Sequence, residues 1–281
     1  MNPIEVRGVT RRYGEVQALV GVDLDVKVGE ELAVHGPNGA GKTTLVEILE
    51  GLRHREGGTA TVLGADPADT AREWRSRIGA VLQVSTQNDE LTVGEMVTAY
   101  AGYYPHPLDI DHLLEALDLT SIRDRRIHQL SGGQRRRLDL ALGLVGDPEL
   151  LFLDEPTTGL DPEVRIRIWE FIEGLAEQGT TILLTTHYME EAETLADRVA
   201  VLVGGRIVTT GPPDDLGGSG GVHVSFRLTE PLLTVPRPDE LPPLVVRDQD
   251  HIEVTTDDPT DVVTRFVLWA HTNGGKLADL Q

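Results

Sequence analysis

A glycine-rich segment followed by a lysine and a threonine carries the clearest chemistry in this sequence. Its residues are Gly36, Pro37, Asn38, Gly39, Ala40, Gly41, Lys42 and Thr43, with Thr44 next. Glycines at this spacing let successive N–H groups point at phosphate oxygens, and a helix N-terminus adds about half a positive charge. Lys42 would reach the β- and γ-phosphates of a nucleotide, and the Thr43 hydroxyl would ligate Mg²⁺. The segment therefore predicts a phosphate-binding loop rather than an ordinary glycine-rich turn.

A second segment, farther along the chain, ends an apolar run with two carboxylates. Residues 150–153 have the pattern of a buried strand, and Asp154 and Glu155 follow directly. A carboxylate at a strand end can hold the Mg²⁺ of a bound nucleotide, and its neighbour can orient the attacking water. An acidic pair in this position is often only solvated, so the interpretation depends on the phosphate loop. Together, the two segments predict a nucleotide-hydrolysing site.

The elements around these segments alternate between strands and helices. A short apolar run at 32–35 precedes the glycines, and Lys42 to Leu52 has helical spacing. Beyond Glu155 the pattern predicts, in turn, a helix at 162–178, a strand at 180–185, a helix at 189–196 and a strand at 199–203. This alternation predicts an α/β fold with a mainly parallel sheet and helices on both of its faces.

The remaining segments suggest three smaller parts. Residues 1–30 read as two or three short strands with a turn at 11–14, and a region from about 84 to 145 is mostly helical. Composition changes at the Gly/Ser-rich stretch 217–221, which predicts a flexible linker. We expect one domain over 1–216 and a small α+β domain over 222–281, with strands near 222–228, 244–247 and 252–255 and a helix near 261–273.

The amino-acid composition of the chain argues against some kinds of binding partner and excludes some kinds of chemistry. The 281-residue chain has 25 Lys+Arg against 46 Asp+Glu residues, a formal net charge of −21, and no cysteine. Nucleic-acid binders usually carry a basic surface, so the acidity argues against such a partner. The lack of cysteine excludes a disulfide framework and thiolate chemistry.

The hydropathy pattern indicates whether the chain itself could span a membrane. No apolar run reaches the roughly 20 residues of a membrane-spanning helix, and the N-terminus lacks the layout of a secretory signal. We therefore expect a cytoplasmic chain, and any work at a membrane would need a separate spanning polypeptide.

The segment Leu130-Ser131-Gly132-Gly133-Gln134 resembles the signature motif of the ABC (ATP-binding cassette) ATPases. Independently of the resemblance, a serine and two glycine N–H groups opening a helix form an anion-binding arrangement. The resemblance extends over about 1–216 and implies a phosphate-loop NTPase fold with an antiparallel N-terminal β subdomain and a helical subdomain. It also implies that this element completes the ATP site of the opposite subunit, so that two ATPase domains sandwich the nucleotide.

Four further residues match landmarks of the same family in order. Tyr13 resembles the aromatic residue that stacks on adenine, and Gln83 resembles the glutamine that contacts Mg²⁺ and water. Asp161 resembles the residue of the loop that communicates across the dimer, and His187 resembles the histidine that contacts the γ-phosphate. Outside this series a turn tyrosine would be structural as often as functional, and a lone histidine after a strand would more often be structural.

The resemblance implies hydrolysis of ATP to ADP and phosphate with Mg²⁺ as cofactor. Lys42 and His187 would stabilise charge on the transferring phosphoryl group, and Glu155 would act on water. The implied partners are a separate transmembrane subunit, contacted by residues of about 85–104, and a second ATPase subunit, which we expect to be a copy of this chain bound with ATP. The chain would then work peripherally at the cytoplasmic side of the cell membrane.

Two segments resemble the drug-resistance (daunorubicin-type) exporter branch of the family, namely 157–162 and 187–193. Export of a small molecule such as a drug or antibiotic is therefore the preferred expectation. An importer ATPase and a soluble ABC ATPase of DNA repair or translation remain as alternatives. The chain has neither the sustained heptads of the repair proteins nor the second phosphate loop usual in the translation factors.

Two features fit the family pattern less directly. His35 occupies a position before the first loop glycine that is generally aliphatic in the family, and it receives no role. Arg135, Arg136 and Arg137 are consecutive and therefore point in different directions on a helix, so they cannot form one basic patch. Solvated faces and local ion pairs are the expected account of these arginines.

Overall fold

The computed structural model describes residues 2–81, 90–216, 222–229, 232, 244–246, 251–256, 265–267, 269–270, 272–275 and 277–278. The chain divides into two compact units, Met1–Leu216 and Gly217–Gln281. The predicted linker at 217–221 lies outside the described residues, as does the sequence position Gln83.

A six-stranded sheet forms the centre of the first unit, in the order β5-β6-β7-β3-β8-β9. All neighbouring pairs are parallel except β8 with β9, which is antiparallel. The strands are β3 (Glu31–His35), β5 (Ile78–Val81), β6 (Leu150–Asp154), β7 (Thr181–Thr186), β8 (Arg198–Val203) and β9 (Arg206–Gly211).

The parallel strands are apolar throughout because both of their faces are covered. Successive side chains of a strand point to opposite faces, so β6 divides its residues between two cores. Leu150 and Phe152 pack in one core with the N-terminal strands, whereas Leu151 and Leu153 pack in the other with the helices. A run that lacks polar–apolar alternation is thus explained by burial on both sides.

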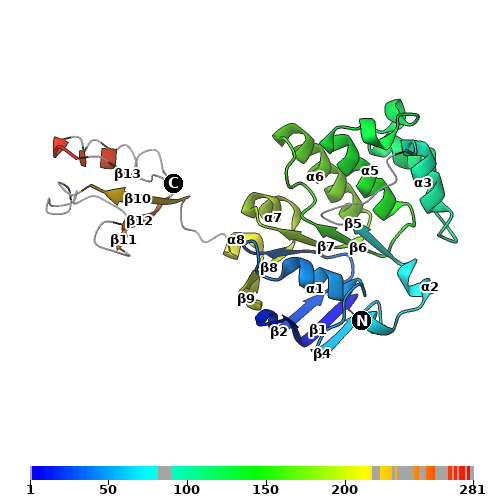
Figure 1. Cartoon of the computed structure of the whole chain (residues 1–281), viewed down its shortest axis with the longest axis horizontal. Helices are drawn as coiled ribbons and strands as arrows, with labels where there is room; N and C mark the ends of the chain where they lie inside the picture. The colour runs from blue at the N-terminus through cyan, green and yellow to red at the C-terminus, as the bar shows by residue number, and fades with distance from the viewer. Residues whose placement is uncertain are drawn as a thin grey trace. The chain divides into compact units, whose positions relative to one another are not determined.

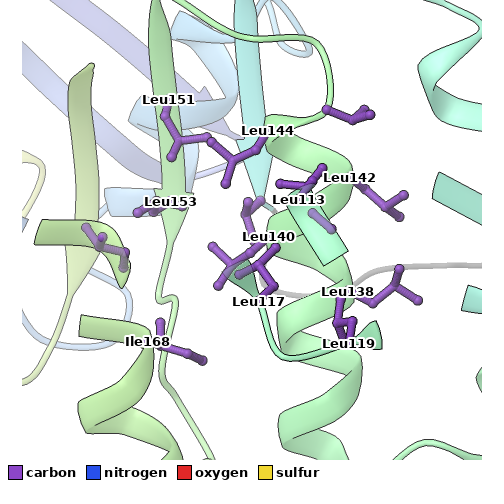
Figure 2. Packing of buried hydrophobic residues seen from close by; sticks show 14 of the residues in the cluster. Leu113, Leu117, Leu119, Leu138, Leu140, Leu142, Leu144, Leu151, Leu153 and Ile168 are labelled. Carbon is purple, nitrogen blue, oxygen red and sulfur yellow. The ribbon is translucent and has the colours of Figure 1, made fainter. Parts of the chain in front are cut away.

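Helices α3, α5 and α6 cover one face of this sheet (Figure 1). Helix α5 carries leucines at alternate positions from Leu138 to Leu144, which places apolar groups around most of its circumference, and all four are buried. Figure 2 shows these side chains meeting Leu113 of α4, Leu117 directly after it, and Leu151 and Leu153 of β6. The helices are α1 (Lys42–Leu49), α2 (Arg72–Arg75), α3 (Val93–Ala101), α4 (Ile110–Ala116), α5 (Gly132–Leu144), α6 (Pro162–Glu177), α7 (Met189–Leu195) and α8 (Pro213–Leu216), with short 3₁₀ turns at Pro67–Asp69, Thr120–Ile122 and Ile127–Gln129.

The other face is covered by α1 and by an antiparallel three-stranded sheet (Figure 1). Its order is β2-β1-β4, with β1 at Ile4–Tyr13, β2 at Val16–Val26 and β4 at Gly57–Val62. The predicted turn at 11–14 is wrong, because β1 continues to Tyr13 and pairs there with Val16, which leaves the turn at Gly14 and Glu15. Strand β4 was not anticipated; its glycines and threonines lack the apolar alternation on which the sequence prediction relied.

The second unit contains a four-stranded antiparallel sheet in the order β11-β12-β10-β13. Its strands are β10 (Val222–Leu228), β11 (Leu244–Val246), β12 (His251–Thr256) and β13 (Leu277–Ala278). Residues 265–267, 269–270 and 272 are helical. The rings of Phe226 and Phe266 meet edge to face with their centroids 4.6 Å apart, and both residues are fully buried in a small core.

The predicted fold class is confirmed by this architecture. A mainly parallel sheet, an antiparallel N-terminal sheet and a group of helices between β5 and β6 make up the first unit, and the second unit is α+β. Within the described residues, none of the helices has the length and apolar character to cross a bilayer.

Candidate functional site

The glycine-rich loop leaves the end of β3 and leads into α1. Gly41 directly precedes the helix with φ of 108°, a left-handed conformation that residues with a Cβ rarely adopt. A Cβ at this position would also lie 2.5 Å from the carbonyl oxygen of Ala18. The loop then folds over Lys42, whose Nζ donates to the carbonyl oxygens of Gly36 at 2.8 Å and Pro37 at 3.3 Å. The lysine is held inside its own loop and is buried.

Glu155 lies across from this lysine, immediately after β6. Its Oε1 is 3.4 Å from Lys42 Nζ and 3.3 Å from His187 Nδ1, and its Oε2 accepts a hydrogen bond from the Thr158 hydroxyl at 3.1 Å. Burial by itself raises the pKa of Glu155, but the Thr158 hydrogen bond and the charges of Lys42 and His187 outweigh it, so the pKa is lowered. The carboxylate therefore stays ionised at neutral pH although it is almost fully buried.

Asp154 occupies the last position of β6 and is also buried. Its Oδ1 accepts a hydrogen bond from the hydroxyl of Thr185 on the neighbouring strand β7. The amide of Glu155 donates to the Thr185 carbonyl and hydroxyl oxygens, at 3.1 Å in each case. Thr185 thus binds the Asp154 carboxylate and fixes the backbone of Glu155, a role that no sequence signal indicated.

His187 follows β7, and His35 ends the adjacent strand β3. Because β3 and β7 are parallel and paired, their ends meet at the same edge of the sheet. Burial lowers the pKa of His35, and the charges of Lys42 and His187 lower it further. The sequence assigned His35 no role, and the structure places it beside the cationic side of the site.

Tyr13 is the expected adenine-stacking residue, and it lies at the end of β1 with 37% of its surface exposed. The guanidinium groups of Arg11 and Arg53 lie 5.0 and 5.2 Å from the centre of its ring. Arg53 also pairs with Glu47 of α1, so the aromatic ring is adjacent to the helix that begins at the phosphate loop. Thr43 and Thr44 occupy the first turn of this helix, and Thr43 is exposed.

The signature segment begins α5 with a reciprocal cap. The amide of Gln134 donates to the Ser131 hydroxyl at 3.3 Å, and the Ser131 amide donates to Gln134 Oε1 at 3.0 Å. Asp161 caps α6 in a similar way by accepting from the Val164 amide at 3.1 Å. A Cβ at Gly133 would lie 2.9 Å from Val164 Cγ1, so the starts of the two helices are in close contact.

Ser131, Gly132 and Asp161 are exposed at these helix starts, whereas Lys42, Asp154 and Glu155 are buried. The predicted site residues therefore fall into a buried group and an exposed group. Gln83 and residues 85–89 of the predicted membrane contact lie outside the described residues.

Arg136 departs from the expected solvated arrangement of the three arginines. Its side chain is buried and donates to backbone carbonyls at the end of β6. Arg137 does form the expected ion pair, with Asp118 at 2.6 Å. The arginine run alone could not separate these cases, because it does not say which side of α5 faces the sheet.

Comparisons with known proteins agree with this geometry. A family model described as ABC transporter matches residues 19–158. The Nod factor export ATP-binding protein I of Burkholderia orbicola is 43% identical over 219 residues, covering 76% of this chain and 72% of the relative. The daunorubicin resistance ATP-binding protein DrrA2 of Streptomyces coeruleorubidus is 45% identical over 218 residues, covering 76% of this chain and 68% of the relative.

A solved structure extends the similarity to three dimensions. The dimeric structure of an ATP-binding cassette in a post-hydrolysis state, bound to ADP and phosphate, superposes with a TM-score of 0.67. It is 26% identical, and the match covers 75% of this chain and 98% of that one.

Proposed function

This chain belongs to the ABC transporter family as an ATP-binding and ATP-hydrolysing subunit, and we propose that it powers export of a small molecule through a separate membrane subunit. The observation that supports ATP hydrolysis as the source of this power is the buried, ionised carboxylate of Glu155 between Lys42 and His187. An anionic group with two cationic or hydrogen-bonding neighbours is suited to polarise water beside a phosphoryl group.

Glu155 and the two residues beside it would have distinct parts in hydrolysis. Glu155 would accept a hydrogen bond from the attacking water and orient this water in line with the γ-phosphate. Lys42, now held by Gly36 and Pro37, would exchange these contacts for phosphate oxygens. His187 would donate a hydrogen bond to charge that develops on the transferring group. The backbone amides that start α1 would add the positive end of the helix dipole.

The donor set of the site fits Mg²⁺ bound together with a nucleotide. Asp154 supplies a buried carboxylate, and Thr43 supplies a hydroxyl in the first turn of α1. Across the described part of the chain, no group of three or more His, Cys, Asp or Glu side chains could hold a metal ion by itself. This suits Mg²⁺, which usually keeps several waters and binds through one or two carboxylates and phosphates. When bound, Mg²⁺ would neutralise charge on the β- and γ-phosphates; the sequence also predicts Gln83 among its contacts.

The residues at the starts of α5 and α6 would act across a dimer. Ser131, Gly132, Gly133 and Gln134 present helix-start N–H groups that could bind the phosphates of a nucleotide held by another copy of the chain. Asp161 lies beside them through the contact of Gly133 with Val164. The similarity to a dimeric cassette supports this arrangement. We propose an ATP-dependent homodimer in which each nucleotide also stacks on Tyr13.

The direction of transport rests on relatives whose names describe export or drug resistance. Substrate recognition would belong to the membrane subunit, which residues 90–104 would contact in part. The chain would work at the cytoplasmic side of the membrane, with no nucleic acid as partner, in keeping with its net charge of −21.

The direct test uses Glu155→Gln, which keeps the shape of the side chain and removes its charge. Turnover should fall by about 10²–10⁴-fold because a general base is lost, while Mg-ATP should now convert the variant from monomer to dimer in size-exclusion chromatography with light scattering. Unchanged turnover would remove Glu155 from its role. A monomer with and without Mg-ATP would remove the homodimer.

The membrane role needs its own measurement. Co-purification of the chain with membrane vesicles, rather than with ribosomes or DNA, is expected. Recovery with ribosomes or DNA instead would favour a soluble ABC ATPase and overturn the transport proposal.

A further inference from the structure

Arg136 of helix α5 holds the end of strand β6 through three backbone groups. Its Nε donates to the carbonyl of Pro156 at 2.7 Å, and its Nη2 donates to the carbonyls of Asp154 at 3.0 Å and Glu155 at 3.2 Å. The side chain is buried, so these bonds form away from solvent. One guanidinium group therefore fixes the consecutive carbonyls that surround the proposed catalytic carboxylate.

The backbone of Glu155 requires such support because its φ is 47°. This left-handed conformation is disfavoured for a residue with a Cβ and persists only where its surroundings impose it. On the N-terminal side, the Glu155 amide donates to Thr185 of β7 at 3.1 Å. On the C-terminal side, its carbonyl accepts from Arg136. The two contacts together set the direction in which the carboxylate leaves the chain, toward Lys42.

The charge of Arg136 is suited to its surroundings. Burial lowers the pKa of Arg136, whereas the charges of Asp139, Asp154 and Glu191 raise it, and a guanidinium stays protonated in proteins. Asp139, on the same helix, lies 4.0 Å from Nη1. Carbonyls and carboxylates accept hydrogen bonds without donating any, so a neutral apolar side chain here would remove one hydrogen bond from each of these buried carbonyls.

We propose that Arg136 is a positioning residue for ATP hydrolysis, one that holds Glu155 in the orientation facing Lys42 and His187. The proposal rests on the function proposed above, in which Glu155 acts on water. Because Arg136 lies on the same helix as the signature residues Ser131–Gln134, it also links a segment that would contact the nucleotide of the opposite subunit to the carboxylate of its own subunit. A displacement of α5 would thus be transmitted to Glu155.

The first experiment separates positioning from simple core packing. Arg136→Gln and Arg136→Lys are purified as full chains, and kcat and KM for ATP are measured together with the thermal midpoint. A misdirected carboxylate should lower kcat by about 10–10²-fold while KM changes little, because the loop that binds the phosphates is intact. Arg136→Lys keeps the positive charge, but its single ammonium group cannot bind all three carbonyls as the planar guanidinium does. Its kcat should therefore lie between those of wild type and Arg136→Gln.

Arg198→Gln is the control for loss of a partly buried arginine. Arg198 of β8 donates to Glu30 at 2.7 Å and to the Asp25 carbonyl at 2.5 Å, which is a comparable set of bonds outside the proposed site. This variant should lower the thermal midpoint and leave kcat unchanged. If Arg136→Gln behaves in the same way, Arg136 is structural and the proposal is overturned. If Arg136→Gln does not fold, Arg136→Lys decides, because a wild-type kcat in that variant would equally overturn it.

A double-mutant comparison then tests whether Arg136 acts through Glu155. In the Glu155→Gln background, Arg136→Gln should cause little further loss of turnover, since the group that it orients is already inactive. If the double variant instead loses turnover by the product of the two single fold-changes, the positioning proposal is overturned and the proposed function stands. No loss of turnover in Glu155→Gln alone would instead overturn the role of Glu155, and the role of Arg136 with it.

Discussion

Two carboxyl groups at opposite edges of the central sheet are equally buried, but their pKa values shift in opposite directions. Glu31 starts β3 and Glu155 follows the end of β6, and each is 8% exposed. Burial, Asp197 and Glu173 raise the pKa of Glu31 to about 8. For Glu155 the Thr158 hydroxyl, Lys42 and His187 outweigh burial, and the pKa is lowered. Burial alone therefore does not mark the site; the groups that stabilise the ionised form of the buried acid do.

The strand topology explains where those groups gather. In a parallel sheet all strands end at one edge, so the loops that follow β3, β6 and β7 converge there and bring Lys42, Glu155 and His187 together. The opposite edge has a cavity of about 510 Å³, lined in part by Arg77, Glu149 and Thr181. Its main charge pair, Arg77 with Glu149, is about half exposed. This cavity therefore does not include the buried residues Lys42, Asp154 and Glu155.

Loss of the lysine ammonium should weaken the contrast between the two edges and have the largest effect on turnover. Lys42→Met keeps the bulk of the side chain but takes away a cation that lowers the pKa of Glu155. Turnover, followed as phosphate release, should fall by about 10²–10³-fold, as for other single groups that stabilise transition-state charge. Lys27→Met is the control, because Lys27 is exposed and lies outside the site. Equal turnover in the two variants would contradict the assignment of Lys42.

A buried acid near the active edge should matter for stability even though it is outside the catalytic group. Glu191 of α7 accepts from the hydroxyl of Thr157 at 2.6 Å and from the indole of Trp169 at 3.0 Å. Glu191→Ala leaves both buried donors unpaired and should lower the free energy of unfolding by about 2–4 kcal/mol. Denaturant unfolding measures this, and the adjacent, exposed Glu190→Ala should stay within about 0.5 kcal/mol of wild type. Similar free energies of unfolding in the two variants would show that the hydrogen bonds to Glu191 do not stabilise the fold.

The raised pKa of Glu31 predicts a pH dependence of the opposite sign from that of a stabilised carboxylate. Between pH 4.5 and about 8 the folded state keeps the proton that the unfolded state has lost. The contribution of Glu31 to the free energy of unfolding is therefore complete below pH 4.5. It falls as the pH rises, by at most about 1.4 kcal/mol per pH unit. Glu31→Gln stays neutral and should be more stable than wild type at pH 8–9, with a flatter profile of thermal midpoint against pH. Parallel profiles would show that Glu31 titrates normally.

The charge pair beside the large cavity should have the smallest effect. Arg77 donates to both oxygens of Glu149, at 2.6 and 2.9 Å, but the pair is exposed to solvent. Arg77→Ala should cost no more than about 1 kcal/mol of stability and leave turnover at the wild-type value. A large loss of turnover would mean that the two edges are coupled, and the comparison would have to be revised.

Much of the fold was predictable from local patterns. The glycine loop before a helix, the apolar strand that ends in Asp154 and the alternation of strands and helices all depend on residues close in sequence. The fold class that they predicted is confirmed. The turn at 11–14 was misplaced because the polar residues at the end of β1 resemble turn residues, although their backbone is paired with β2.

The sequence by itself determined which residues could bind phosphate and act on water, because those properties belong to side-chain type and to spacing along a loop or helix start. Only the tertiary structure decided that Thr185 binds the Asp154 carboxylate and the Glu155 amide and that Arg136 is buried against Asp154, Glu155 and Pro156. Arg136 lies 18 to 20 positions from those carbonyls. Which face of a helix meets which strand end depends on how the apolar surfaces of distant segments pack, and a local pattern does not contain that information.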